Sequence, residues 1–224
     1  MRTCLLSLLA VAPMLASQDE PSRRLDEAAV VFSEIMTAPD KGIPEELLEK
    51  AQCIVVVPGM KKGAFIVGAK YGKGFVSCRG DHHTGWSAPG AVRIEGGSVG
   101  FQFGGSETDV VLLVMNQRGA DRLLGDQFTL GGEGEVAAGP VGRSAAAQTD
   151  AKMTAEILSW SRTRGVFAGV SLQGATLRQD LEDNAALYGR KLRNREIVDS
   201  NVAPPQAASR LLSLLSRYSP RENS

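Results

Sequence analysis

Apolar residues recur at three- and four-residue intervals over residues 22–38, which predicts an amphipathic helix with one buried side. That side consists of Leu25, Ala28, Ala29, Phe32, Ile35 and Met36. Pro39 and Gly42 are expected to end the helix. A short second helix is predicted from Pro44 to Lys50, because proline is favoured in the first turn of a helix.

Between residues 53 and 115 the pattern changes to runs rich in β-branched and aromatic residues, which predict strands. Two runs lie on either side of the Tyr-Gly-Lys-Gly segment at residues 71–74, where we expect a hairpin turn. Residues 98–105 and 109–115 supply two further strands. The order of these runs favours antiparallel hairpins, followed by a helix over residues 119–124.

Residues 156–164 and 165–177 are predicted as two more strands, although the composition of the first also fits a helix. The next predicted helix spans residues 178–192, and its expected apolar side is formed by Leu181, Ala185, Leu187 and Tyr188. Pro204-Pro205 makes a linker before a segment at residues 209–218, whose apolar side is Leu211, Leu212, Leu214 and Leu215. This last segment either docks on the core or frays.

The strands follow one another without the regularly interleaved helices of parallel sheets. We therefore predict a single α+β domain with a mainly antiparallel sheet, flanked by N- and C-terminal helices. A barrel-like form is one option for that sheet.

The 224 residues carry 25 basic and 25 acidic side chains, so the formal charge is 0. A protein with this balance lacks the general positive field that holds nucleic acid, which is therefore not an expected partner. Residues 58–93, however, hold six bases and one acid, a net of +5, whereas residues 18–49 hold nine acids and three bases, a net of −6. The sequence thus allows a basic face on a neutral protein.

The N-terminus has the pattern of a cleaved signal peptide over residues 1–16. Arg2 precedes an apolar run that ends near Ala12, and small residues and acids follow. The run is too short to span a membrane, and Cys4 precedes it, which is the wrong place for a lipoprotein anchor. We expect an exported protein, periplasmic or extracellular, without a transmembrane segment or lipid anchor.

Cys53 and Cys78 remain after the predicted cleavage, each within an apolar, strand-like run. In an exported chain they could form a disulfide, but two is also a usual number of free buried thiols. The spacing alone leaves both options open.

No segment predicts catalysis, a metal or a cofactor. Residues 96–100 match the Gly-x-Ser-x-Gly nucleophile elbow, but a strand-like run follows, and both histidines, His82 and His83, precede the serine. Asp81, His82 and His83 are adjacent, so on a strand they would point to opposite sides and would not form a metal site. We expect a protein that is not an enzyme.

Five segments resemble a known family in their order along the chain and in their amino-acid sequences. They are IPEELLEKAQCIVVVPGMKKGAFIVGAKYGKGFVSCR, GWSAPGAVRIEGGSVGFQFGGSETDVVLLVMN, FTLGGEGEVAAGPVGR, SRTRGVFAGVSLQGATL and ALYG. Over about residues 24–192 the chain resembles the SYLF domain, which occurs in bacterial exported proteins and in eukaryotic endocytic proteins. The expected SYLF-like domain spans residues 22–195, and residues 199–224 form the linker and terminal helix.

The resemblance implies binding of acidic phospholipids, especially phosphoinositides, by eukaryotic members, and binding and bundling of actin filaments by fungal members. An exported chain does not meet actin, so the expected partner is an anionic phospholipid or membrane surface. The N-terminal helix of eukaryotic members is linked to membrane contact. Here that helix carries Asp26, Glu27 and Glu34 beside Arg23 and Arg24 and is therefore not basic, which favours packing on the core over membrane contact.

The candidates for contacts with a lipid headgroup are Lys61, Lys62, Arg143, Arg162 and Arg164. The two lysines follow a predicted turn at Pro58-Gly59, and the arginines lie in family-like segments where they could bind phosphate through two hydrogen bonds. The alternative roles are solvated loop lysines and arginines that bind glycine-rich backbone.

Two other functions stay open from the sequence. One is a scaffold protein that binds a protein partner through its sheet or through the terminal helix at Leu211–Leu215. The other is a carrier that holds a lipid chain in an internal cavity.

Overall fold

The computed structural model describes residues 14–38, 42–64, 67–79, 85–99, 104–130, 136–138, 156–163, 166–167, 172, 174–200 and 202–219. The described helices are α1 (Met14–Met36), α2 (Glu45–Lys50), α3 (Gln117–Leu123), α5 (Leu181–Tyr188), α6 (Asn194–Asp199), the 3₁₀ turn η1 (Gln206–Ala208) and α7 (Ser209–Tyr218). The described strands are β1 (Cys53–Ala64), β2 (Val67–Cys78), β3 (Gly90–Val99), β4 (Gly104–Val114), β5 (Gln127–Thr129), β6 (Val136–Ala138), β7 (Ile157–Thr163), β8 (Val166–Phe167) and β9 (Thr176–Gln179).

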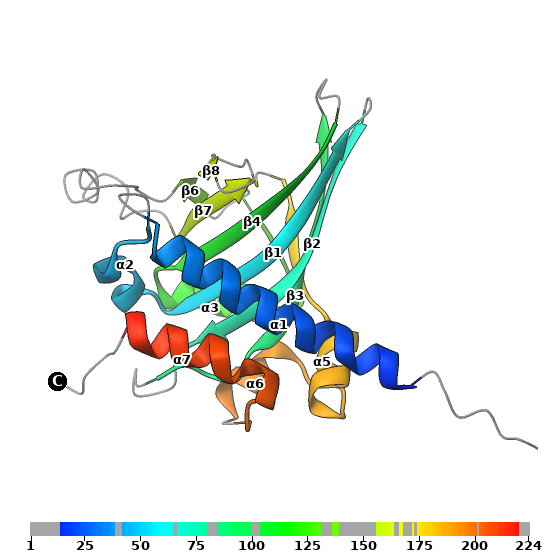
Figure 1. The fold of residues 1–224 in the computed structure, drawn as a ribbon, viewed down its shortest axis with the longest axis vertical. Coiled ribbons are helices and arrows are strands. Elements are labelled where there is room, and N and C mark those ends of the chain that lie inside the picture. Colours follow the sequence, from blue (N-terminus) through cyan, green and yellow to red (C-terminus); the bar gives the residue numbers. More distant parts are fainter. Residues whose placement is uncertain are drawn as a thin grey trace, which may run out of the picture.

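These strands form one sheet in the order β5-β9-β3-β2-β1-β4-β7-β6, and β8 pairs with β7. Among the described pairings, β6 with β7 is parallel and the others are antiparallel. The sheet curves into a half-barrel, and α1 crosses one of its faces beside α7 (Figure 1). The predicted α+β domain with a mainly antiparallel sheet and flanking terminal helices is therefore confirmed. Residues 156–164, which also fitted a helix, contain strand β7.

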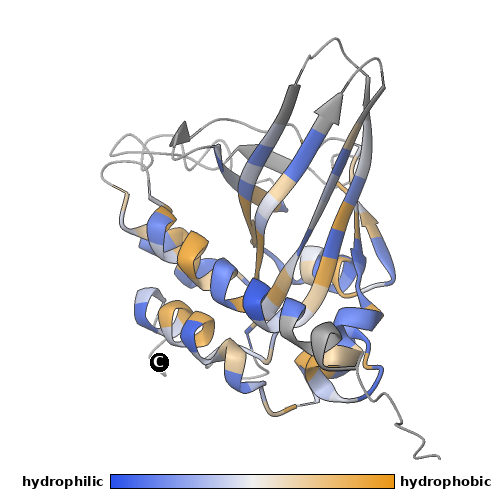
Figure 2. Cartoon of the chain, turned by 45° about the vertical axis from the view of Figure 1, so that its right-hand side comes forward, coloured by the Kyte–Doolittle hydropathy of each residue, from blue (hydrophilic) through white to orange (hydrophobic). Residues whose placement is uncertain are grey.

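The alternation of side chains along β1 gives the sheet two apolar faces. Ile54 and Val56 belong to the buried cluster under α1, whereas Val55 and Val57 belong to the cluster on the opposite, concave face. Figure 2 shows hydrophobic residues where the helices meet the sheet, and the long strands β1–β4 project away from the helices at their other end.

The amphipathic stripe predicted for α1 packs on the sheet. Leu25, Phe32 and Ile35 are fully buried in the cluster under the helix, together with Leu211 and Leu215 of α7. Of the two outcomes for the terminal segment, the structure shows docking. In the described part of the chain no helix has both the length and the apolar character needed to cross a membrane.

A buried arginine fixes the end of α7. The Arg79 guanidinium lies 4.0 Å from the centroid of the Trp86 ring, and it donates hydrogen bonds to the carbonyl oxygen of Ser219 at 3.1 Å and to the Ser219 hydroxyl. That hydroxyl also donates to the carbonyl oxygen of Leu48 at 3.2 Å. Arg79 thus joins the end of β2 to the C-terminal helix and to α2.

Replacing Arg79 with alanine is expected to lower the free energy of unfolding by about 2 kcal/mol, because buried hydrogen bonds from a charged donor are lost. Urea denaturation measures the loss, and trypsin should cut faster at Arg210 and Arg217 in α7. Arg217→Ala, at an exposed position of the same helix, is the matched control and should change stability by less than about 0.5 kcal/mol. An Arg79→Ala variant as stable as this control would contradict the role of Arg79.

The expected hairpin turn at residues 71–74 is wrong, because these residues lie within β2. Glycine is uncommon in strands, but here it gives room to the neighbouring strand. A Cβ atom at Gly74 would lie 2.1 Å from the carbonyl oxygen of Val56, and one at Gly72 would lie 2.8 Å from Val57. The two glycines let Val56 and Val57 of β1 lie close against the backbone of the neighbouring strand β2.

The apolar side expected for the helix after β9 is only partly correct. Leu187 and Tyr188 pack against buried clusters, but the buried residues of α5 are Asp183 and Asn184, and Leu181 is 37% exposed. Asn184 donates from its side-chain nitrogen to the Leu192 carbonyl oxygen and accepts from the Ala91 N–H. The helix therefore faces the sheet with polar groups that satisfy backbone hydrogen bonds.

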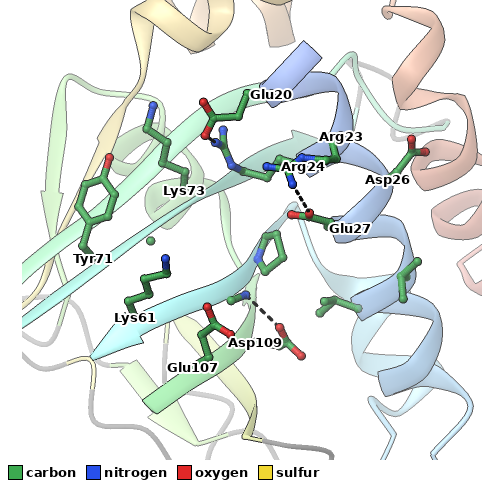
Figure 3. A pocket seen from close by; sticks show the side chains of 15 residues that line it. Glu20, Arg23, Arg24, Asp26, Glu27, Lys61, Tyr71, Lys73, Glu107 and Asp109 are labelled. Carbon is green, nitrogen blue, oxygen red and sulfur yellow. Dashed lines mark hydrogen bonds and ion pairs between the residues drawn. The ribbon is translucent and has the colours of Figure 1, made fainter. Parts of the chain in front are cut away.

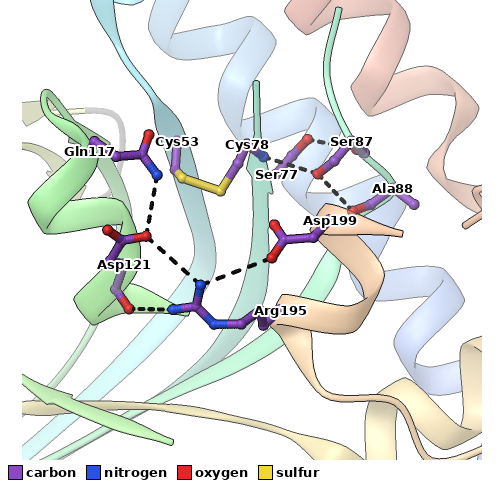
Figure 4. Close-up of a disulfide and its surroundings, with 9 residues drawn as sticks. All are labelled: Cys53, Ser77, Cys78, Ser87, Ala88, Gln117, Asp121, Arg195 and Asp199. Atoms are coloured by element: carbon purple, nitrogen blue, oxygen red, sulfur yellow. Dashed lines mark hydrogen bonds and ion pairs between the residues drawn. A yellow bond between two sulfur atoms is a disulfide. The ribbon is translucent and has the colours of Figure 1, made fainter. Parts of the chain in front are cut away.

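Cys53 and Cys78 form a disulfide (Figure 4). They stand directly opposite each other on β1 and β2, with their Cα atoms 3.9 Å apart, and both are buried. Of the two options that the sequence left open, the structure shows the pair.

Candidate functional site

A groove of about 770 Å³ lies between α1 and the strands β1, β2 and β4 (Figure 3). Its basic side chains are Arg23, Arg24, Lys61 and Lys73, and its acidic side chains are Glu20, Asp26, Glu27, Glu107 and Asp109. Val30 and Tyr71 also line it, and they are 36% and 46% exposed. The groove is therefore mixed in charge and partly apolar.

A β-bulge at Pro58 and Gly59 sets which side chains face this groove. The register of β1 shifts between Val57 and Met60 on the side of β4, and Gly59 has a positive φ of 55°. The Gly59 N–H donates to Asp109 Oδ1 at 3.0 Å. Because the bulge changes the alternation, Met60 joins Val57 on the concave face and Lys61 lies on the groove side.

Lys61 stands between Tyr71 of β2 and Glu107 of β4 in the strand register. Its side chain is exposed, and in the described part of the chain it forms no ion pair. The sequence placed Lys61 and Lys62 after a turn. The structure places them within a continuous strand that contains a bulge.

Lys62 lies on the opposite, concave side of β1, directly across from Lys70 of β2. Lys62 is half-buried and Lys70 is 5% exposed. Burial lowers the pKa of Lys70, and the positive charge of Lys62 lowers it further.

At the other end of the groove Lys73 joins a buried acidic cluster. Its Nζ lies 2.9 Å from Asp180 Oδ2 and 3.0 Å from Asp183 Oδ1. Asp183 also accepts from Arg24 of α1 at 2.5 Å, and Arg24 lies 2.7 Å from Glu20. The cluster connects α1, β2 and α5, so these charges hold the fold together.

The pKa values in this cluster follow from its contacts. Burial lowers the pKa of Lys73, but hydrogen bonds to Asp180 and Asp183 outweigh burial and raise it above its ordinary value. Burial raises the pKa of Asp180, but the hydrogen bonds from Lys73 and from the Asp183 backbone outweigh it and hold that pKa below its ordinary value. Both groups are therefore charged at neutral pH.

Arg162 of β7 lies at the C-terminal half of α1 and forms two ion pairs. It contacts Asp109 Oδ2 at 2.9 Å and also Glu34 of α1. Burial lowers the pKa of Arg162, but hydrogen bonds to Asp109 and Glu34 outweigh it and raise that pKa. Arg162 thus ties α1 to the sheet, 14% of its side chain remaining exposed.

The other candidate residues are distributed as follows. Arg143 and Arg164 lie outside the described residues, as do Asp81, His82 and His83. Ser98, the centre of the elbow-like motif, lies within β3. The described residues include no group of three or more side chains of the kinds that hold a metal ion.

Comparison with known proteins identifies the family. The Ysc84 family, described as Las17-binding protein actin regulator, matches residues 95–218. The SH3 domain-containing YSC84-like protein 1 of Mus musculus is 34% identical over 190 residues, which is 84% of this chain and 55% of the relative. The LAS seventeen-binding protein 3 of Saccharomyces cerevisiae is 33% identical over 180 residues, which is 79% of this chain and 39% of the relative. This chain belongs to the Ysc84 family.

The Ysc84 family is the family of the SYLF domain, so the resemblance to the SYLF domain in the sequence is confirmed at the level of the family. The chain spans about half the length of the YSC84-like relatives that it matches, and a smaller share of the fungal ones, such as an SH3 domain-containing protein of Schizosaccharomyces pombe with 40% covered. The Ysc84 match runs from β3 to α7 and so includes Asp109, Arg162 and Asp183.

Several residues that shape this Ysc84-family site were missed in the sequence. Asp180 and Asp183 lie more than a hundred positions from Lys73, and α5 showed only its apolar pattern. The single available signal was a pair of acids next to a predicted strand end. The groove itself has no local signature, because it forms between α1 and three strands, β1, β2 and β4.

Proposed function

We propose that this protein is a non-enzymatic module that binds anionic phospholipid at a membrane surface. The observation that carries the proposal is the pair Lys61 and Lys62, which presents positive charge on both faces of one strand. In the described part of the chain neither lysine forms an ion pair. A lysine near an anionic surface contributes about 1 kcal/mol to binding.

Arg143, Arg162 and Arg164 enter the proposal as additional phosphate contacts. For Arg162 this contact would have to compete with Asp109 and Glu34, which already accept its hydrogen bonds. Each arginine is replaced singly by alanine and tested by co-sedimentation with anionic vesicles. Weaker binding by a variant that stays folded indicates a headgroup contact, and loss of stability indicates a structural role.

The proposed location is outside the cytoplasm. Two features support it: the signal-peptide pattern of residues 1–16 and the disulfide between Cys53 and Cys78, since disulfides persist in oxidising compartments. Under this proposal the protein meets the envelope lipids of the cell that exports it, and actin is not its partner.

Replacing both lysines, in the variant Lys61→Gln/Lys62→Gln, is expected to weaken binding to vesicles of 30% phosphatidylserine in phosphatidylcholine about thirtyfold, which corresponds to about 2 kcal/mol. Co-sedimentation over a salt series measures this, and wild-type binding should fall as salt rises because the charges are screened. The control Lys50→Gln/Lys191→Gln changes two exposed lysines elsewhere by the same charge. Equal binding by both double variants would refute the role of Lys61 and Lys62, and absence of wild-type binding at every salt concentration would refute the proposed function.

A second candidate function is binding of a protein partner. It is favoured by the name of the Saccharomyces cerevisiae relative, which is a LAS seventeen-binding protein, and by the exposure of Val30 and Tyr71 in the groove. In the folded state the apolar side of α7 is not available for such a contact, because Leu211 and Leu215 are buried in the cluster under α1. A protein partner that stays bound as the salt concentration rises would distinguish this function from lipid binding, which is expected to weaken with salt.

A further inference from the structure

The four longest strands extend past the helices at one end of the sheet (Figures 1 and 2). The register of the strands defines this end. Lys62 stands opposite Lys70 and Ser106, and Lys70 stands opposite Gly96. We call the described residues from this row outward, 62–64, 67–70, 96–99 and 104–106, the sheet tip.

The composition of the sheet tip changes abruptly beyond the Lys62 and Lys70 row. Further out, its described residues are Gly63, Ala64, Val67, Gly68, Ala69, Gly97, Ser98, Val99, Gly104 and Gly105. Each is small or aliphatic, and none is charged.

The charged residues closest to this uncharged end are mainly basic. Lys62 and Lys70 form its inner boundary, and Lys61 lies one position further in. The nearest acids, Glu95 and Glu107, occupy the Lys61 row. An uncharged end bordered by lysines matches the layers of an anionic membrane, in which phosphates lie above the acyl chains.

On the basis of the proposed function, we infer that the sheet tip is the part of the protein that enters the membrane interface, with Lys62 at the level of the lipid phosphates. Lys70 stands in the same row but is 5% exposed, so the phosphate contact is assigned to Lys62. The three residues from Lys70 to Val67 span about 10 Å at roughly 3.3 Å per residue. This length is close to the depth of about 5–10 Å at which interfacial segments bury their apolar side.

The backbone of the sheet tip tolerates such an environment. β1 and β2 pair up to Ala64 and Gly68, and β2 and β3 pair up to Val67 and Val99. β4 pairs with β1 up to Gly104 and Ala64, so the two inner strands of the tip, β1 and β2, are bonded on both sides. Peptide groups bonded between neighbouring strands need no water, so desolvating this end costs less than desolvating an unpaired loop.

The groove beside α1 fits a membrane less well than the sheet tip does. It holds five acidic side chains against four basic ones, and two of those four, Arg24 and Lys73, are already held by Asp183. Acidic side chains are repelled by an anionic surface. The charge pattern therefore points to the end of the sheet and away from α1.

The test adds acid to the sheet tip at two exposed positions, in the variant Ala69→Asp/Ser106→Asp. Binding to vesicles of 30% phosphatidylserine in phosphatidylcholine is expected to fall at least tenfold. The matched control Ser209→Asp/Ser213→Asp makes the same charge change on exposed positions of α7, at the far side of the molecule, and should lose less than threefold. Ala69→Asn/Ser106→Asn should also lose less than threefold, since it changes polarity without charge.

The outcomes separate this inference from the proposed function. Wild-type binding with equal losses in the two aspartate variants would overturn the role of the sheet tip and leave lipid binding intact. No wild-type binding would overturn both. Should the tip variant fail to fold, Ser106→Trp gives an independent measurement: its additional fluorescence should be quenched by vesicles with brominated acyl chains, and unquenched emission from bound protein would overturn the inference.

Discussion

Replacing Lys73 with methionine is expected to lower the free energy of unfolding by about 3 to 5 kcal/mol, because it removes one partner of a buried ion pair. Asp180 is 1% exposed and lies 2.9 Å from Lys73 Nζ, so its carboxylate would stay buried without that charge. Asp183 would keep Arg24, which limits the damage to one carboxylate. Urea denaturation at pH 7 measures the loss.

The control is the double variant Lys73→Met/Asp180→Asn, which removes both charges. Asparagine still caps α5, because its side-chain oxygen can accept from the Asp183 N–H as Asp180 does. The double variant should therefore recover most of the stability. If it is no more stable than Lys73→Met alone, the buried charge is not the cause of the loss.

The same pair predicts a pH dependence that the double variant should lack. The pKa of Asp180 is lowered on folding, so its contribution to stability is present above about pH 4, its unfolded value, and is lost as the pH falls through the folded pKa. The pKa of Lys73 is raised on folding, so its contribution is present below about pH 10.4 and is lost as the pH rises through the folded pKa. Between these limits the contribution of the pair is constant.

Loss of the disulfide is expected to cost about 3.5 kcal/mol, from the chain entropy of a cross-link whose cysteines are 25 residues apart. The variant Cys53→Ala/Cys78→Ala, compared with wild type by thermal or urea denaturation, measures this cost. Reductant should bring the wild type close to the variant and leave the variant unchanged.

In the full chain, with residues 1–16 present, Cys4→Ser is the control for other thiol effects, because Cys4 is the cysteine outside the Cys53–Cys78 pair. It should leave the stability of the protein and its response to reductant as in the wild type. If the fully reduced wild-type protein is as stable as the oxidised one, the prediction is contradicted.

Much of the fold follows from local patterns. The stripe on α1 from Leu25 to Ile35 and the continuous apolar runs of β1 and β4 each predict burial, because these patterns depend on residues close in sequence. The leucines of α7 likewise indicated an apolar side. These elements were predictable since no distant contact overrides them.

The parts that were missed depend on contacts between distant segments. Gly72 and Gly74 have the composition of a turn, and only the approach of β1 explains them as strand residues. Whether Cys53 meets Cys78 depends on the register of β1 with β2. The cluster of Lys73, Asp183 and Arg24 joins three elements, and each of these residues alone is typical of a solvated surface.

The covalent bond between Cys53 and Cys78 also determines which side chains face which side of the sheet. The cysteines fix one matched pair at the end of β1 and β2 that lies opposite to the sheet tip. A slip of one residue between these strands would move every side chain of one strand to the other face, and Lys61 and Lys62 would each change face. The disulfide therefore fixes the register of β1 with β2 and prevents the slipped pairings that a glycine-rich hairpin would otherwise sample. In this way it also fixes the faces on which Lys61 and Lys62 lie, although both are far from the bond along the strand.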